Sequence, residues 1–526
     1  MKLKGVFLLI LLSGFFLGLY YHYLLEQLSG IPFLQTLSIQ GNSPYWRAIS
    51  YILTHFFTIL SSLSIILVSS IIVLENRNPA KTVAWLLILT IFPVIGFIFY
   101  IFTGRNVRKK RRYKYKLIDL NDLQGLIHIS YDFRNDDGLK DLLYKPERII
   151  HLLLYNASSP MTQYNRVKVL TNGEETYGAM LGSLEKAKDH IHFISFIVRD
   201  DQVGREFKQL LIRKAKAGVK VRMIIDGLGS RSLPSSYLDE LKEAGVEVYI
   251  FSPIIFPYLR KVNYRNHRKI TIIDGKVGFV GGLNVGDEYL GKGEQFSFWR
   301  DTHMMLEGDS VYFLQMIFLM DWRFTAQSEL SMEKRYFPRH EVKEQLYVQI
   351  AASGPDSDWE YIQKVYFSLI TTARRTVYIT TPYLIPDDSI LMALKTAALS
   401  GVDVRIIVPE EPDHLIVFWA SRSYYTELLE AGVQIYSYQK GFIHAKIVIV
   451  DQEMATLGTA NFDIRSFQYN FEVSGVIYDS DVAKRLEDDF VQDMMDSVEI
   501  KLHDFNNRPF SQKAKESIAR LMSPLL

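Results

Sequence analysis

Three long apolar stretches open the chain. Residues 5–25, 48–74 and 82–104 contain no Asp, Glu, Lys or Arg. A helix of about 20 apolar residues crosses the hydrocarbon core of a bilayer, and each stretch is long enough to do so. The pattern predicts a transmembrane region over residues 1–104, in which the second and third segments form a hairpin.

A different pattern fills the rest of the chain, where short β-branched runs alternate with helical stretches. The runs at 166–170, 191–197 and 377–381 read as strands, and Gly218, Gly245, Gly401 and Gly432 each end a helix and lead into another strand. This alternation is typical of layered α/β domains. We predict two similar α/β/α sandwich halves related by a pseudo-two-fold axis, at 147–335 and 336–526.

Two further stretches complete the second half. Residues 480–497 read as a closing helix, with Val482, Leu486, Phe490 and Met494 on one side. The tail, residues 511–526, is amphipathic enough to contact a membrane surface, but we expect it to pack on the body of the protein.

Charge is nearly balanced overall, at +2, but it is unevenly distributed. Residues 105–146 form a linker that begins with a basic collar of Arg105, Arg108, Lys109, Lys110, Arg111, Arg112, Lys114 and Lys116. By the positive-inside rule the collar is cytoplasmic, which predicts a multi-pass protein of the cell membrane with its C-terminal body on the cytoplasmic side. In an alternative topology only the hairpin spans, and residues 5–25 are interfacial or re-entrant.

Composition excludes several kinds of site. The chain has no cysteine, so disulfide frameworks, thiolate zinc sites and cysteine nucleophiles are ruled out. The balanced charge and the apolar segments favour membrane lipid and the bilayer as partners, and we expect no nucleic acid.

One motif occurs twice, 177 residues apart. Residues 267–274 read His-Arg-Lys-Ile-Thr-Ile-Ile-Asp, and Gly281-Gly-Leu-Asn284 follows; residues 444–451 read His-Ala-Lys-Ile-Val-Ile-Val-Asp, and Gly458-Thr-Ala-Asn461 follows. A single His-x-Lys before an apolar strand is usually the solvated start of that strand. Because both halves keep the whole spacing, the pair indicates chemistry.

An imidazole beside an ammonium group suits attack on an anionic tetrahedral centre such as a phosphodiester. A two-fold axis would bring both motifs into one cleft, where one histidine attacks phosphorus and the other protonates the leaving alkoxide. The non-bridging oxygens would be held by Lys269, Lys446, Asn284 and Asn461. This chemistry requires no metal and no other cofactor.

The motif aspartates, Asp274 and Asp451, complete the candidate catalytic set with His267, Lys269, His444 and Lys446. Strand parity, however, places each aspartate on the opposite face from its histidine, and this favours a structural role through backbone N–H groups. The carboxylate that orients each imidazole must then come from elsewhere. We expect Glu472 to serve His444, and Glu294 or Asp301 to serve His267.

The two motifs resemble those of the phospholipase D superfamily, and the sequence around them resembles the bacterial cardiolipin synthases. The similarity extends over essentially the whole chain, from Glu75-Asn-Arg-Asn-Pro through Trp299-Arg-Asp-Thr-His to the final Ser523-Pro-Leu-Leu. It implies transfer of a phosphatidyl group between two phosphatidylglycerol molecules, giving cardiolipin and glycerol through a phosphohistidine. The superfamily pattern implies His267 as nucleophile and His444 as acid and then base.

Three other readings stay open on the residues alone. A hydrolytic phospholipase D would release phosphatidic acid with the same motifs, since the acceptor depends on how well the cleft excludes water. A membrane-anchored nuclease of the superfamily and a non-catalytic membrane scaffold are the other two. The oligomeric state is left open as well.

Overall fold

The computed structural model describes residues 147–525 except 158, 254–262, 329, 331 and 358, together with residues 70, 74, 82, 83 and 85–88. The chain separates into two compact units, Met1–Asn106 and Val107–Leu526. Apart from these few positions before residue 147, the three apolar segments, the collar and the linker lie outside the described residues. Within the described residues, no helix is both long and apolar enough to cross a bilayer.

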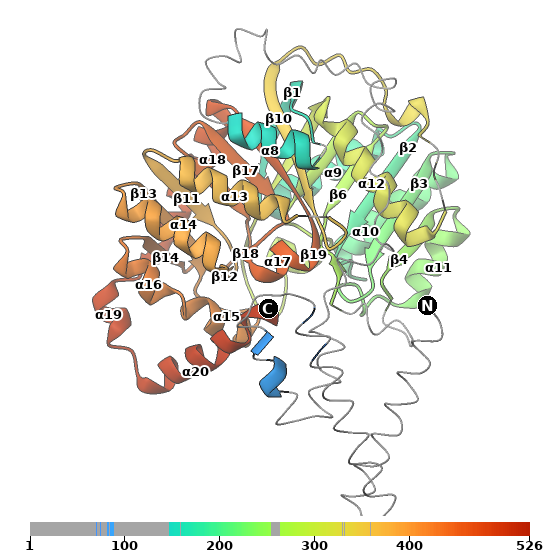
Figure 1. Ribbon diagram of the computed structural model, residues 1–526. Coiled ribbons are helices and arrows are strands. Elements are labelled where there is room, and N and C mark those ends of the chain that lie inside the picture. Colours follow the sequence, from blue (N-terminus) through green and yellow to red (C-terminus); the bar gives the residue numbers. More distant parts are fainter. Residues whose placement is uncertain are drawn as a thin grey trace, which may run out of the picture. The chain divides into compact units, whose positions relative to one another are not determined.

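One continuous mixed β-sheet runs through the second unit (Figure 1). Read outwards from its centre, the first half contributes β1 (Thr162–Thr171), β9 (Thr302–Gly308), β7 (Val277–Gly281), β6 (Ile270–Ile273), β2 (His190–Ser195), β3 (Lys220–Asp226) and β4 (Glu247–Phe251). The second half contributes β10 (Gln345–Ser353), β19 (Asn470–Tyr478), β17 (Met454–Gly458), β16 (Ile447–Val450), β11 (Thr376–Thr380), β13 (Asp403–Pro409), β14 (Gln434–Tyr438) and the edge strand β20 (Ser497–Glu499).

The two strand orders correspond position by position as far as β4 and β14, and they meet where β1 pairs antiparallel with β10. This is the duplicated α/β architecture that the sequence predicts. The two halves differ from two separate sandwiches in that their sheets are joined, so the pseudo-two-fold axis passes through one shared sheet.

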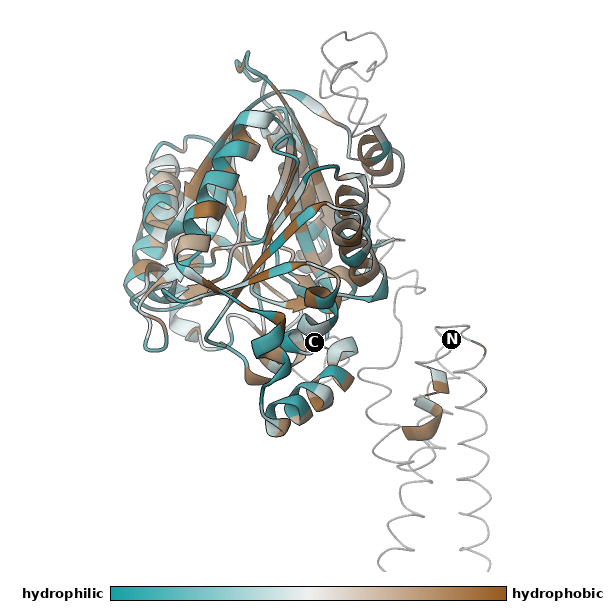
Figure 2. Ribbon diagram, turned by 90° about the vertical axis from the view of Figure 1, so that its left-hand side faces the viewer, coloured by the Kyte–Doolittle hydropathy of each residue, from teal (hydrophilic) through white to brown (hydrophobic). Residues whose placement is uncertain are grey.

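Helices cover both faces of the sheet because the strands alternate apolar residues between them. In β16, Ile447 and Ile449 face α12 (Ser310–Ala326) and α18 (Ser480–Met495), whereas Val448 and Val450 face the opposite layer. That layer consists of α9 (Asn172–Glu185), α10 (Gln202–Lys216) and α11 (Ser235–Glu243) in the first half, and of α8 (Glu147–Ala157), α13 (Tyr361–Thr372), α14 (Asp388–Leu399) and α16 (Tyr425–Glu430) in the second. Figure 2 shows the apolar strands enclosed between these helices.

The C-terminal region agrees with its sequence pattern. Helix α18 buries Val482, Leu486 and Phe490, as its period predicts. Helices α19 (Leu502–Asn506) and α20 (Phe510–Leu521) follow, and α20 packs against α15 (Leu415–Arg422). The expectation that the tail packs on the body is therefore confirmed.

The first glycine of each Asn segment lies where two strands press together. A Cβ at Gly458 would lie 2.3 Å from the carbonyl oxygen of Val473 and 2.5 Å from Cα of Ser474, both in the neighbouring strand β19. A Cβ at Gly281 would lie 2.5 Å from Cα of His303 in β9. Because backbone atoms cannot move aside separately, these positions exclude any side chain.

We expect Gly458→Ala to lower the free energy of unfolding by about 1–3 kcal/mol, since it overpacks the β17–β19 contact. The matched control is Gly178→Ala, at an exposed position of α9 with open space around the new methyl group. It should stabilise the protein by roughly 0.5–1 kcal/mol through helix propensity. Denaturant titration of the detergent-solubilised protein measures both, and equal effects would contradict the close strand approach.

Candidate active site

Two short parallel strand pairs join the halves beside the motif histidines. Strand β5 (Arg265–Asn266) pairs with the start of β19, and β15 (Phe442–Ile443) pairs with β8 (Trp299–Arg300). The next backbone N–H in each case continues the pairing: that of His267 donates to the carbonyl of Phe471 at 2.9 Å, and that of His444 donates to the carbonyl of Arg300 at 2.7 Å. Each histidine is thus fixed by the opposite half.

The carboxylates that hold the imidazoles also come from the opposite half. Nδ1 of His267 lies 3.0 Å from both carboxylate oxygens of Glu472, and Nδ1 of His444 lies 2.7 Å from Oδ2 of Asp301. Both acids are fully buried. The sequence-based assignment of Glu472 to His444, and of Glu294 or Asp301 to His267, is therefore wrong. The parallel pairing carries each acid across the seam between the halves, and Glu294 is exposed on the cavity wall.

Strand register shows that the two acids occupy equivalent places. Gly281 pairs with His303 in β9, and Gly458 pairs with Ser474 in β19. Asp301 lies two residues before His303, and Glu472 lies two residues before Ser474. The two acids therefore hold the same position in the two halves.

The difference between Gly-Gly and Gly-Thr in the two motifs follows from the length of these acids. A Cβ at Gly282 would lie 2.0 Å from Oδ1 of Asp301, so no side chain fits beside the shorter acid. In the other half the hydroxyl of Thr459 donates to Glu472 at 2.5 Å. The site is therefore only quasi-symmetric, and it is the hydrogen bonding of the carboxylates that differs.

Each motif lysine is buried just before its strand and folds back on its own motif. Nζ of Lys269 donates to the carbonyl oxygen of His267 at 2.8 Å, and Nζ of Lys446 donates to that of His444. Burial lowers the pKa of Lys269 to about 7 and that of Lys446 to about 8, although nearby carboxylates oppose the shift. At pH 7 Lys269 is therefore about half protonated and Lys446 mostly protonated, and an anion bound nearby would raise the pKa of both.

The protein surroundings keep both imidazoles neutral at pH 7. Burial lowers the pKa of His267 to about 4; burial, helped by the charge of Lys446, lowers that of His444 to about 3. Burial alone would raise the pKa of Glu472 and Asp301, but interactions with the partner imidazole, through charge when it is protonated and through its hydrogen bond, together with the nearby motif lysine, hold both pKa values below their usual range. An ionised acid accepts Nδ1–H, so Nε2 of each ring keeps its lone pair.

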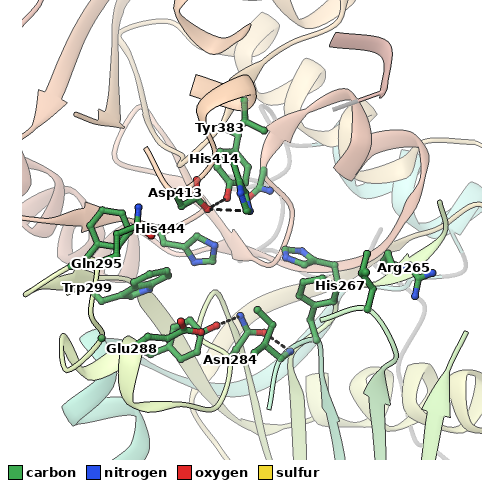
Figure 3. Close-up of a pocket in the computed structure, with 18 of the residues that line it drawn as sticks. Arg265, His267, Asn284, Glu288, Gln295, Trp299, Tyr383, Asp413, His414 and His444 are labelled. Carbon is green, nitrogen blue, oxygen red and sulfur yellow. Dashed lines mark hydrogen bonds and ion pairs between the residues drawn. The ribbon is translucent and has the colours of Figure 1, made fainter. Parts of the chain in front are cut away.

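Both rings line one cavity of about 810 Å³ and point toward one another (Figure 3). Asn284 and Asn461 also line it. Asn284 accepts the backbone N–H of Ile197 at 3.1 Å and donates to the hydroxyl of Tyr289 at 3.0 Å. Oδ1 of Asn461 is buried and has no hydrogen-bond partner among the described residues. The fold thus brings both histidines and both asparagines to one cleft.

Comparison with known proteins identifies the family that this pair of motifs belongs to. A family profile described as cardiolipin synthase, PLD-like domain, matches residues 180–306 and 366–494, and one described as phospholipase D-nuclease N-terminal matches residues 62–105. A cardiolipin synthase of Geobacillus kaustophilus is 46% identical over 474 residues, covering 89% of this chain and 94% of its own. The chain belongs to the cardiolipin synthase family. Its activity is that of a phosphatidyltransferase.

Two further relatives are informative in different ways. The major cardiolipin synthase of Bacillus subtilis is 43% identical over 495 residues, which is 91% of this chain and all of that protein. The crystal structure of a phosphatidylserine synthase from Haemophilus influenzae covers 73% of this chain and all of its own, with a TM-score of 0.56 and 16% identity. The second likeness concerns the fold alone.

The motif aspartates lie away from the cleft of this cardiolipin synthase family member. Asp274 accepts the backbone N–H groups of residues 188–190, just before β2, at 2.8–2.9 Å. Asp451 accepts those of residues 374–376, before β11, at 2.7–3.2 Å. Each carboxylate connects the end of its own strand to the start of the neighbouring strand. The contacts of these two members of the candidate catalytic set are therefore structural.

Several lining residues have no counterpart in the sequence-based candidates. Phe196 meets the ring of His267 edge-on at 5.0 Å, and Trp299 packs against His444 at 5.2 Å between ring centres. The polar walls are formed by Arg199, Arg265, Glu288, Tyr289, Tyr383, Asp413, Asp463 and Arg465. Trp299 stands in a stretch that carries the family resemblance, and this stretch is the one signal for it in the sequence, whereas nothing in the sequence marks Asp413.

The crossed pairing predicts which imidazole responds when one acid is neutralised. Glu472→Gln should shift the ¹⁵N and Nδ1–H signals of His267 and leave those of His444 nearly unchanged, while Asp301→Asn does the reverse. Each change should lower kcat by about 10²–10⁴-fold, because an amide can favour the wrong tautomer. Histidine-selective ¹⁵N spectra measure the shifts, and a response of the same-half histidine would contradict the pairing.

Proposed function

We propose that this protein transfers a phosphatidyl group from one phosphatidylglycerol to a hydroxyl group of a second, releasing glycerol and forming cardiolipin. The observation that carries this proposal is the pair of facing imidazoles, each with Nδ1 held by a buried carboxylate of the other half. Family membership supplies the lipid class. Two identical groups in unequal surroundings can divide nucleophilic and acid–base work.

In the first half-reaction Nε2 of His267 attacks phosphorus, and the bond from phosphorus to the glycerol oxygen breaks. His444, as imidazolium, gives its proton to that oxygen, so glycerol leaves as the alcohol. The protein surroundings keep His444 neutral at pH 7, but a bound phosphodiester places a negative charge beside its ring, and this raises the pKa of His444.

In the second half-reaction the neutral His444 takes the proton of a hydroxyl of the second phosphatidylglycerol. The oxygen attacks phosphorus, the phosphorus–nitrogen bond breaks, and His267 returns to its starting state. Negative charge on the non-bridging oxygens is held by Lys269 and Lys446, with the amides of Asn284 and Asn461, in a buried setting where such contacts are strong. Glu472 and Asp301 stabilise whichever imidazole carries positive charge.

The cavity favours lipid transfer over hydrolysis. Its volume of about 810 Å³ is near the upper end for a small-molecule site, which leaves room for a second headgroup. The second lipid brings its own phosphate, and Arg465 lines the cavity as a further cation, whereas the charge of Arg265 is paired with the buried Asp226 at 3.3 Å. The guanidinium of Arg465 donates to the neutral Asn263 at 3.2 and 3.4 Å. Water as acceptor would need neither the space nor this cation.

We further propose that the reaction takes place at the cell membrane, with the body on the cytoplasmic side. The support is the sequence: the predicted transmembrane segments and the basic collar at residues 105–116. A phosphatidylglycerol substrate requires the same setting, because its acyl chains stay in the bilayer.

Product analysis tests the reaction itself. Purified full-length protein given phosphatidylglycerol alone should produce cardiolipin and glycerol in equal amounts. The control is His267→Ala with His444→Ala, which should produce neither. Phosphatidic acid as the main product would show that the protein is a hydrolase and not a transferase. Unchanged turnover in the double variant would show that this site does not catalyse the reaction.

A substrate with a good leaving group separates the roles of the histidines. Phosphatidyl-p-nitrophenol releases nitrophenolate without an acid, so His444→Ala should give a burst of one nitrophenolate per enzyme and keep ³²P on the protein. His267→Ala should give neither burst nor label. Neutral detergent quenching preserves the acid-labile phosphohistidine, and rapid-quench measurement gives the burst. A burst in His267→Ala would assign the nucleophile to the other half.

A further inference from the structure

Helix α20 carries its large apolar residues outwards and, of its apolar residues, buries only the small Ala519. Phe510, Ile518 and Leu521 are 84%, 67% and 79% exposed, whereas Glu516 is 2% exposed. The spacing of 510, 514, 518 and 521 places one apolar ridge along the helix, with Ala514 in its middle. A surface helix of a soluble protein has the opposite arrangement, so this ridge is built to meet something apolar.

Buried polar contacts fix that orientation. Glu516 accepts hydrogen bonds from Arg508 at 2.6–3.1 Å and from Arg422 of α15 at 3.3 Å. Arg520 pairs with Glu427 of α16 and donates to the carbonyl of Ser423 at 3.1 Å. The helix is therefore attached to the protein through its polar side. If α20 rotated to bury the apolar ridge, Glu516 and Arg520 would lose these ion-pair partners.

The apolar surface continues from α20 to the active-site cavity. On α15, which packs against α20, Leu415 and Ile416 are 67% and 56% exposed. The residues on either side of them, His414 and Val417, line the cavity that contains the two histidines. Helices α15 and α20 lie side by side near the C-terminus (Figure 1). The exposed ridge thus reaches the rim of the site.

Cations accompany the ridge. Lys513 and Lys515 are exposed on its two flanks, and Nζ of Lys515 lies 5.1 Å from the ring centre of Trp419. A second cavity of about 330 Å³ beside α20 is lined by Arg508, Lys513 and Arg520 together with the acid Glu516 and uncharged polar residues, so its cations outnumber its carboxylate. An apolar ridge between lysines matches the interface of a bilayer that carries anionic headgroups.

We propose that α15 and α20 form an interfacial surface that seats the catalytic unit on an anionic lipid leaflet. Phe510, Ile518 and Leu521 enter the headgroup region, the lysines meet lipid phosphates, and a headgroup reaches the facing histidines past His414 and Val417. The surface serves the proposed lipid reaction, on which its purpose rests, but its contact with lipid is measurable without catalysis.

The cysteine-free chain makes the contact directly measurable. Ile518→Cys in the full-length protein, labelled with the fluorophore NBD and reconstituted into vesicles of phosphatidylglycerol and phosphatidylcholine, should show blue-shifted emission that lipids with doxyl-labelled acyl chains quench. The control is Met392→Cys on α14, which is 60% exposed and outside both cavities. Equal emission at the two positions would overturn the proposal. A blue shift without quenching would also overturn it, because protein would then cover the ridge.

Enzyme kinetics on variants of the ridge test the same proposal in a second way. Phe510→Ser with Ile518→Ser and Leu521→Ser should raise KM for vesicle phosphatidylglycerol on the order of tenfold or more and leave kcat on detergent-dispersed lipid unchanged. Met392→Ser with Leu399→Ser, similarly exposed on α14, should change neither. Unchanged KM in the triple variant would overturn the proposal. If the labelled ridge enters lipid but wild-type protein makes no cardiolipin, the proposed function fails and the surface stands.

Discussion

The crossed bonds between imidazoles and carboxylates are the interaction on which the rest of this structure depends. Glu472 holds His267, and Asp301 holds His444, so each half supplies the carboxylate that orients the other half's motif histidine. The short parallel pairs β5–β19 and β15–β8 lie at the same seam. A half on its own would have a histidine without a defined tautomer. The active site is therefore a property of the duplicated sheet as a whole.

Burial gives these bonds their strength and sets the protonation of the cleft. Two ionised acids and two lysines are almost removed from water, which is costly unless each charge is paired or hydrogen-bonded. The acids are satisfied by the imidazoles and, at Glu472, by Thr459. The lysines donate to backbone carbonyls of their own motifs. An ammonium group has three donors, and those that remain match the non-bridging oxygens of a phosphodiester.

Local sequence patterns predict much of this molecule. The run of β-branched residues at 447–450 predicts a strand between two apolar layers, and the period of two along it separates Asp274 and Asp451 from their histidines. The duplication predicts one cleft with two histidines. These features depend on neighbours in sequence, which is why they can be read from it.

The pairing of the acids could not be read in that way. Asp301 follows Asn284 by 17 residues, whereas Glu472 follows Asn461 by 11, so the repeat does not align the two acids by spacing. Their equivalence exists only in the register of β9 and β19, and their partners are chosen by strands that cross between the halves. Asp413 and Tyr383 reach the cavity through tertiary packing alone.

A crystal structure of the full-length protein with vanadate tests the central claim most directly, because vanadate adopts the geometry of phosphorus in transfer. The account predicts a trigonal-bipyramidal vanadium bonded to Nε2 of His267, with the opposite apical oxygen within hydrogen-bonding distance of Nε2 of His444. Nδ1 of each ring should stay on the carboxylate of the other half. Vanadate bound to one histidine with the other turned away, or carboxylates exchanged to their own halves, would contradict a single site built by both halves.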